Sequence, residues 1–441
     1  MTAPVAASRN WRDLDRAIFR IAVPALGSLA IDPLLTLTDS AFVARLGTTE
    51  LAALGVDAAI LTFAFFAFNF LAFVTTPLVA KAIGRGDPDE ARRYVGTALV
   101  LAVSLGLVVT AVVLALAPSL VSAMGATGAV ASAAISYLRI RACASVAVLV
   151  VTAGHGAFRG HKDTRTPLMV ALGVNAINLV LDPLLIFGLG LGLEGAAWAT
   201  VVAQVSGAVW FLFLIRRRNM AQAPNSLGEG LPVLLTLGRN GALLIIRSAF
   251  LLAAFTMAAS TATRLGPDRI AAHQLVAQLF LLSAMVADAL EVAGQALVAE
   301  ESAHRDIHRL RALTRRLLSW GVVVGLVLFL VVGLGRHVLA LLASDDVVAG
   351  LVVATGGVAT LIIPLAALVF VADGVFVGLL SLGTMAVSTG LGAVVAISLM
   401  LWSPLGSTLE GIWWALGIFM VGRGLVFLAG YRRSTEMAVR S

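Results

Sequence analysis

Long apolar stretches recur along the whole chain, and each of them ends at a cluster of Arg, Gly, Pro or Asp. Each is roughly 20 residues or longer, the length of helix that crosses a hydrocarbon core about 30 Å thick. The pattern therefore predicts an all-α membrane protein. We expect twelve membrane-spanning helices, at approximately 17–46, 51–80, 95–118, 127–155, 168–190, 193–215, 235–263, 268–300, 316–341, 347–372, 382–403 and 408–431.

The composition supports this interpretation. Hydrophobic residues make up 60% of the 441 residues and charged residues only 12%, too few to cover the surface of a soluble globule. Several arginines precede a first span that is too long for the apolar core of a signal peptide, so we expect this helix to remain in the mature protein. The chain has one cysteine, Cys143, which excludes an internal disulfide.

Basic residues cluster in alternate loops, as at 216–218 and 305–316, whereas the opposite loops are short and carry few charges. By the positive-inside rule, the basic loops and both termini face the cytoplasm. We expect the protein to lie in the plasma (inner) membrane. The net charge of +7 then reflects topology and a weak attraction to lipid headgroups, and does not indicate nucleic acid. We predict a cytoplasmic N-terminus (1–16), an N-lobe (17–215), a cytoplasmic linker (216–234), a C-lobe (235–431) and a cytoplasmic C-terminus (432–441).

The two halves of the chain repeat each other. Arg45-Leu46-Gly47 recurs as Arg264-Leu265-Gly266, and Leu78-Val79-Ala80 recurs as Leu297-Val298-Ala299, with the same offset in both cases. Each half has six predicted spans, so the copies enter the membrane from the same side and are related by a pseudo-two-fold axis along the membrane normal. Two six-helix lobes are the architecture of an alternating-access carrier. A channel needs no such duplication, so the pattern favours a transporter over a channel or a structural protein.

Four polar residues fall at one depth in the outer half of the first lobe. A charge at mid-bilayer costs about 2.5–3.5 kcal/mol, so each one calls for a reason. Counting about 1.5 Å per residue from the span ends places Asp39, Asn178, Asp182 and Thr200 together. Two carboxylates in a low-dielectric cluster cannot both stay ionised without a compensating cation, so we predict a site for H⁺ or Na⁺. The alternative is a structural aspartate that bonds Ser40, Thr36 or a backbone carbonyl and holds helices together.

Two of the acidic residues directly precede a proline. Asp32-Pro33 and Asp182-Pro183 each place inside a span a residue that lacks a backbone donor, and we expect these helices to bend. Asp32 lies seven residues before Asp39, on nearly the same helical face but near the membrane centre. We assign Asp32, Asn175 and Asp288 to the substrate cavity. For Asp288, interhelical bonding stays open as an equal alternative.

Other charged residues suggest structural roles. Ala258 stands where the repeat would place Asp39, so we expect ion coupling to be a property of the first lobe. Asp373 and His155 are interpreted as helix-end contacts. Glu194 and Glu410 suit helix N-termini. Four arginines are interpreted as lying near cytoplasmic helix ends, where their side chains can snorkel to water: Arg139, Arg141, Arg247 and Arg423.

Several segments resemble one transporter family. LTDSAFVARLGTTELAALGV (37–56), LVAKAIGRGDPDEARR (78–93) and the region 157–200 are similar to multidrug and toxic compound extrusion (MATE) transporters, and VADALEVAGQALVAEESAHRD (286–306) resembles the DinF-type branch. The resemblance implies the MATE/MOP superfamily fold and a first-lobe cation site at Asp39, Asn178, Asp182 and Thr200. Some members carry a Tyr where this chain has Leu35, so the choice between H⁺ and Na⁺ stays open. At the position of Asp32, many relatives carry an uncharged residue. We expect Asp32 to be either a second protonatable site or a contact for a cationic substrate.

The expected function is secondary active efflux of amphipathic, cationic drug-like compounds by antiport against H⁺ or Na⁺. The alternatives are a lipid-linked saccharide flippase of the same superfamily and a channel or membrane scaffold. We do not expect an enzyme, because the sequence shows no metal-ligand spacing, nucleophile elbow or phosphate loop. We expect no cofactor besides the coupling ion, no nucleic-acid partner, and a monomer surrounded by membrane lipids.

Overall fold

The structure is a computed structural model that describes residues 11–222, 227–341, 343 and 345–440. The side chains of residues 32, 63, 66, 67 and 227–229 also lie outside the described part. The described residues form helices and connecting turns and contain no β-strand, which confirms the predicted all-α class.

The helices belong to two compact units, each considered by itself. The N-unit is Gly27–Gly241, and the C-unit is Met1–Leu26 with Ala242–Ser441, as far as these are described. Two helices contribute to both units: α1 (Trp11–Ala44) and α9 (Leu227–Arg264). The unit boundaries fall inside these helices. The predicted linker at 216–234 is partly helical, because α8 runs to Arg217 and α9 begins at Leu227. The predicted lobe boundaries remain a prediction.

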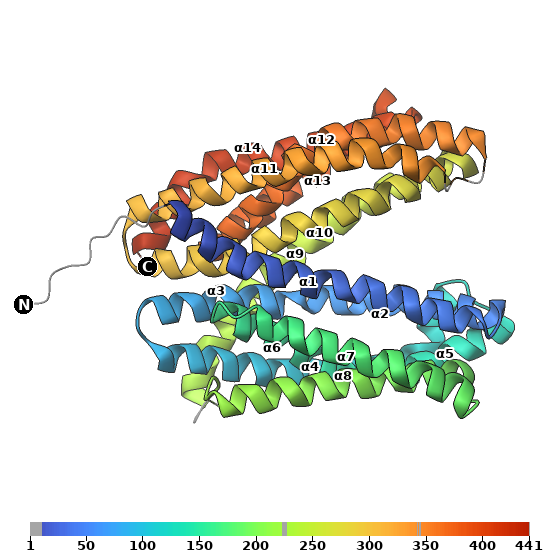
Figure 1. Ribbon diagram of the computed structural model, residues 1–441, viewed down its shortest axis with the longest axis horizontal. Helices are drawn as coiled ribbons and strands as arrows, with labels where there is room; N and C mark the ends of the chain where they lie inside the picture. The colour runs from blue at the N-terminus through green and yellow to red at the C-terminus, as the bar shows by residue number, and fades with distance from the viewer. Residues whose placement is uncertain (1–10, 223–226, 342, 344, 441) are drawn as a thin grey trace, which may run out of the picture. The chain divides into compact units, whose positions relative to one another are not determined.

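The N-unit contains the helices coloured from blue to green in Figure 1. In addition to its parts of α1 and α9, these are α2 (Thr48–Phe66), η1 (Ala67–Asn69), α3 (Phe70–Gly84), α4 (Pro88–Ala123), α5 (Gly128–Ala142), α6 (Ser145–Gly160), α7 (Arg165–Pro183), η2 (Leu184–Gly188) and α8 (Gly192–Arg217). One of its apolar clusters includes Val43 from α1, Ala53 from α2, Leu138 from α5 and Ile186 from η2. This cluster joins the elements on which the candidate site is built.

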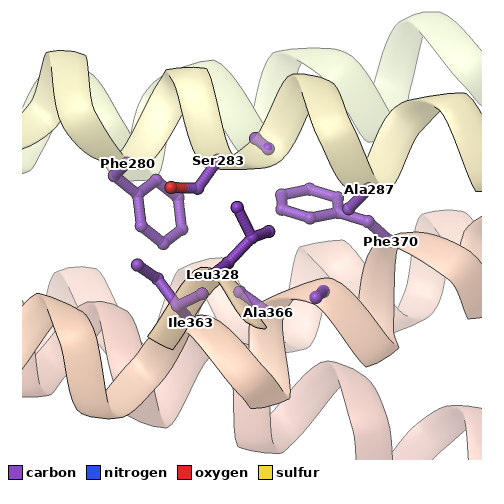
Figure 2. Close-up of a pocket in the computed structure, with 9 residues that line it drawn as sticks. Phe280, Ser283, Ala287, Leu328, Ile363, Ala366 and Phe370 are labelled. Carbon is purple, nitrogen blue, oxygen red and sulfur yellow. The ribbon is translucent and has the colours of Figure 1, made fainter. Parts of the chain in front are cut away.

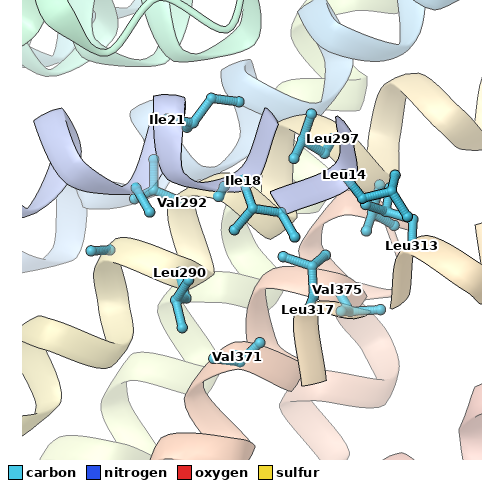
Figure 3. Close-up of a cluster of buried hydrophobic side chains, with 14 of the residues drawn as sticks. Leu14, Ile18, Ile21, Leu290, Val292, Leu297, Leu313, Leu317, Val371 and Val375 are labelled. Carbon is cyan, nitrogen blue, oxygen red and sulfur yellow. The ribbon is translucent and has the colours of Figure 1, made fainter. Parts of the chain in front are cut away.

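The C-unit contains the helices coloured from yellow to red, together with the start of α1. They are α10 (Pro267–Ala303), α11 (Ile307–Ala340), α12 (Asp346–Gly378), α13 (Leu382–Trp402), η3 (Pro404–Ser407) and α14 (Leu409–Arg440). A small, chiefly apolar cavity lies between α10, α11 and α12, where Phe280 and Phe370 face it and Ser283 adds a hydroxyl group (Figure 2). Buried side chains of α1, such as Ile18 and Ile21, pack with side chains of α10, α11 and α12 (Figure 3).

The predicted spans coincide with helices, but two of them are interrupted. Within the described residues, ten helices are long and apolar enough to cross a membrane, and eleven if the bent pair α5 and α6 counts as one span. That pair, bent by 51°, is the predicted span 127–155. The predicted span 51–80 is divided into α2, η1 and α3. An apolar run does not mark such breaks, because the residues on both sides stay hydrophobic.

The outer faces of the long helices are apolar. On α11, Val323, Leu326, Leu330 and Leu334 are all exposed, and they follow the helical repeat of three to four residues. A soluble helix would place polar residues on such a face. These exposed rows fit a multi-pass membrane protein whose helices meet lipid.

The backbone confirms the duplication at its turns. Gly47 and Gly266 both adopt positive φ (149° and 115°), and so do Gly86 and Arg305 (75° and 58°); the two pairs have the same offset along the chain. The left-handed conformation suits glycine at helix ends. An aspartate follows each of the last two, Asp87 after Gly86 and Asp306 after Arg305. Each aspartate side chain accepts backbone N–H hydrogen bonds at the start of the next helix. The two copies therefore share the chemistry of their helix ends.

One close helix crossing also occurs twice. A Cβ atom at Gly156 on α6 would lie 3.0 Å from Cα of Ala72 on α3, and a Cβ at Gly374 on α12 would lie 2.7 Å from Cα of Glu291 on α10. Both residues of the first crossing map onto those of the second at nearly the offset of the sequence repeat. Small residues let helix backbones approach this closely. The same crossing therefore braces both halves of the chain.

Candidate functional site

Two carboxyl groups and one amide meet inside the N-unit. Asn178 on α7 donates from Nδ2 to Oδ1 of Asp39 on α1, at 2.9 Å, and to Oδ2 of Asp182 on its own helix, at 2.8 Å. A primary amide carries two N–H donors, so one side chain serves both acids. The structure thus brings together three of the four residues predicted for the cation site.

The local sequence of α7 explains this geometry. Asn178 and Asp182 are four residues apart and share one helical face, and both are buried. The helix ends at Pro183, which lacks a backbone donor, and continues as the π-helical turn Leu184–Gly188, where Leu189 N donates to Leu184 O at 2.8 Å. The predicted irregularity at Pro183 is thus a change of helix type. The other proline, Pro33, lies within a helix that continues to Ala44.

The site is rich in acceptors and poor in donors. The carboxyl groups of Asp39 and Asp182 also lie close enough to interact with each other, and two carboxyl groups can share a hydrogen bond only if one of them carries a proton. Oδ1 of Asn178 and Oδ1 of Asp182 are buried and have no hydrogen-bond partner. Buried polar atoms are normally paired, so these oxygens are free to bind a cation or a proton donor.

The other predicted residues lie outside this hydrogen-bonded group. Thr200 on α8 is buried, but its hydroxyl donates to Ala196 O on its own helix at 3.0 Å. Asn175 donates to Ala171 O, one turn earlier on α7, at 2.8 Å. The side chain of Asp32 lies outside the described residues. The predicted roles of these three residues remain predictions.

Two charged residues of the N-unit were not predicted as part of a site. Asp57 on α2 is 0% exposed, and neither of its carboxylate oxygens has a hydrogen-bond partner. Arg141, near the end of α5, interacts electrostatically with Asp39, Asp57 and Asp182. Its Nε and Nη1 atoms are buried and unpaired, so the expected snorkelling position was wrong. The available signal was depth, because Arg141 lies midway along the predicted span 127–155.

A second group of buried charges lies in the C-unit. Asp373 on α12 accepts a hydrogen bond from Arg247 on α9 at 2.6 Å and another from Arg423 on α14. Asp373 and Arg423 are fully buried and Arg247 is nearly so. The predictions of snorkelling arginines and of a helix-end contact at Asp373 were therefore wrong, because these residues neutralise one another between three helices. Arg139, in contrast, is exposed.

Asp288 lies beside this second group of charges. It is half-buried on α10 and interacts electrostatically with Arg247, Asp373 and Arg423 and by a hydrogen bond with Glu291. Glu291 accepts from Gln295 at 3.2 Å. Asp288 is not among the residues that line the cavity of Figure 2, although its neighbour Ala287 is. The hydrogen bond of Asp288 is to a residue of its own helix, and both predicted roles of Asp288 remain predictions.

Comparisons with known proteins agree with this fold and its duplication. The family model described as MatE matches residues 24–184 and 244–402, one match in each half. Protein DETOXIFICATION 44, chloroplastic, of Arabidopsis thaliana is 34% identical over 424 residues, which cover 92% of this chain and 80% of the relative. The DNA damage-inducible protein F (DinF) of Escherichia coli (strain K12) is 29% identical over 435 residues, which cover 95% of this chain and 92% of the relative.

A solved structure supports the fold independently. The crystal structure of a MATE protein in the bent conformation superposes with a TM-score of 0.88 at 21% identity, and the match covers 97% of this chain and 98% of that chain. Members of this family are transporters and not enzymes. The chain belongs to the multidrug and toxic compound extrusion (MATE) family, with a DinF-type relative, and is a multi-pass membrane transporter.

Proposed function

We propose that the chain exports organic compounds by antiport, driven by H⁺ or Na⁺ that binds at Asp39, Asn178 and Asp182. One observation carries the proposal: a buried amide holds two carboxyl groups from different helices, while two acceptor oxygens of the same group have no partner. An isolated structural aspartate would use its oxygens to bond its surroundings. This group instead has the charge and the free acceptors to take up a cation.

The same contacts suggest how a cation would change the conformation. With a proton or Na⁺ bound, Asp39 on α1 and Asp182 on α7 can share a compact arrangement through Asn178. Without it, two negative charges lie close together in a low-dielectric environment, and their repulsion favours moving α1 away from α7. A ligand shifts a conformational equilibrium by its differential affinity for the two states. Cation binding and release would therefore alternate the position of α1, and this motion would move the substrate.

The acidic character of the site favours amphipathic organic cations as substrates. Such compounds bind in apolar pockets that hold a few polar groups, and the predicted contact residue is Asp32. We place the working protein in the plasma (inner) membrane as a single chain with both termini in the cytoplasm. The coupling ion is the one accessory group that the mechanism requires.

A proteoliposome assay tests the proposal and identifies the ion. Efflux of ethidium, a fluorescent organic cation, is measured after imposing either a pH gradient or a Na⁺ gradient of the same size. We expect one of the two gradients to accelerate efflux above the rate without a gradient, with H⁺ and Na⁺ distinguished by which gradient is effective. Efflux that responds to neither gradient in purified, folded protein would overturn the proposal.

A further inference from the structure

We infer that Asp57 is a third exchangeable carboxyl group of the cation site and that Arg141 is its fixed counter-ion, so that the site exchanges two positive charges per cycle. The inference rests on the proposed function and extends it from the nature of the coupling site to the number of charges moved. It is argued from side chains of the N-unit that α1, α2, α5 and α7 contribute.

Asp57 is an unusual residue to find buried without partners. It is 0% exposed, and both carboxylate oxygens lack a hydrogen-bond donor. A carboxylate removed from water is costly unless it is paired or hydrogen-bonded. A side chain whose purpose was to tie helices together would have found a donor on a neighbouring helix. Asp57 is therefore positioned to accept something that the protein itself does not supply.

Arg141 connects Asp57 to the site already described. Its guanidinium group interacts electrostatically with Asp57 and also with Asp39 and Asp182. Two of its nitrogen atoms are buried without an acceptor. Asp57 and Arg141 thus interact electrostatically without a hydrogen bond to Asp57, and both oxygens of Asp57 stay open to a cation.

The charge balance sets the capacity of the site. The ionisable groups that interact with Asp57 are Arg141 and Tyr137 from α5, and both of these also interact with Asp39 from α1 and Asp182 from α7. The Tyr137 phenol is neutral in either state. With all acids ionised, three carboxylates and one guanidinium leave two negative charges, and a buried cluster cannot keep both. A cation shared by Asp39 and Asp182 neutralises one of these two negative charges, and a cation at Asp57 neutralises the other.

The charge count determines whether transport responds to membrane potential. Two monovalent cations exchanged for one ethidium ion move net charge across the membrane, whereas one cation exchanged for one ethidium is electroneutral. We would measure ethidium efflux from proteoliposomes under a fixed cation gradient, with a potassium–valinomycin potential that is either zero or negative on the ethidium side. The proteins are the wild type, Asp57→Asn and, as a matched control at the start of the same helix, Glu50→Gln.

We expect the negative potential to accelerate efflux by the wild type and by Glu50→Gln and to leave Asp57→Asn unaffected. Potential-independent efflux by the wild type, or wild-type sensitivity in Asp57→Asn, would overturn the inference. If the gradient drives no efflux by the wild type, the failure is that of the proposed function. Infrared spectroscopy then tests Asp57 without transport: relative to the wild type, we expect Asp57→Asn to lose the absorbance of one exchangeable carboxylic acid group, and an unchanged band would overturn the inference.

Discussion

The two halves of the chain share their turns, helix caps and one helix crossing, and they differ in their buried charges. Turns with positive φ, capping aspartates and a glycine crossing recur at a nearly constant offset. The charges do not recur: the same offset leads from Asp39 to Ala258, and Asp373 corresponds to His155. Helix ends and close crossings depend on a few backbone positions, whereas chemistry depends on single side chains. Duplication has therefore kept one scaffold and given each copy its own charges.

The two groups of charges are neutralised in different ways. In the C-unit, Asp373 is held directly by the guanidinium groups of Arg247 and Arg423, so its counter-charges are fixed parts of the protein. In the N-unit, Asp39 and Asp182 are held by a neutral amide, and buried acceptor oxygens remain without partners. Guanidinium groups bonded directly to the carboxylate suit a structural joint, whereas an amide and unpaired acceptor oxygens suit a mobile cation. We therefore expect substitutions in the first group to affect stability and those in the second to affect coupling.

The largest expected loss of stability comes from Asp373→Asn. It removes the carboxylate that two buried guanidinium groups bond directly, and breaking a buried ion pair by removing one partner costs about 3–5 kcal/mol. Urea unfolding in detergent measures the loss. Asp39→Asn, the parallel change in the N-unit, should cost far less because an amide can replace the protonated carboxyl group. Equal stability losses in the two variants would contradict the distinction between the two groups.

Asn178→Leu should affect both stability and coupling. The substitution removes the donor to two carboxyl groups, and hydrogen bonds to charged groups contribute about 1.5–3 kcal/mol each. We expect lower unfolding stability and loss of gradient-driven ethidium efflux. Ser206→Ala on α8 is the matched control and should leave efflux intact, because the Ser206 hydroxyl bonds the Val202 carbonyl of its own helix and lies outside the site. Wild-type efflux by Asn178→Leu would remove the amide from the mechanism.

The repeated helix crossing predicts matching effects in the two halves. Gly374→Ala and Gly156→Ala each insert a methyl group against the backbone of a neighbouring helix, and overpacking of this kind costs about 1–3 kcal/mol. Thermal unfolding of both variants in detergent should show losses of similar size. A loss confined to one variant would mean that the crossing braces only one copy.

The smallest effect is expected at the helix caps. Backbone N–H groups of Arg309 and His308 hold the pKa of Asp306 below its usual range, so its stabilising contribution is present above the ordinary aspartate pKa and is lost as the pH falls through the lowered value. Asp306→Ala should therefore be less stable than the wild type at neutral pH, and the difference should vanish in acid. Asp87→Ala is the parallel variant in the other copy. A difference between wild type and Asp306→Ala that persists at the lowest pH would contradict the capping role.

Much of the fold and the centre of the site could be predicted from the sequence, because both depend on position along single helices. The length of the apolar runs predicts the spans. Counting residues from the ends of two spans predicts that Asp39 lies at the same depth as Asn178 and Asp182. The same counting could not reveal partners on other helices, so it predicts that Arg247 and Arg423 snorkel near cytoplasmic helix ends, although both bond Asp373. Nor could an apolar run show the bend between α5 and α6 or the break between α2 and α3.

The central claim is that Asp39 and Asp182 exchange a cation for a movement of α1. The most direct measurement is gradient-driven ethidium efflux by Asp39→Asn in proteoliposomes, compared with Ser40→Ala, whose hydroxyl bonds the Thr36 carbonyl of the same helix. We predict that Asp39→Asn folds and reaches the membrane but loses the response to the gradient, while Ser40→Ala keeps it. A full response by Asp39→Asn would contradict the account.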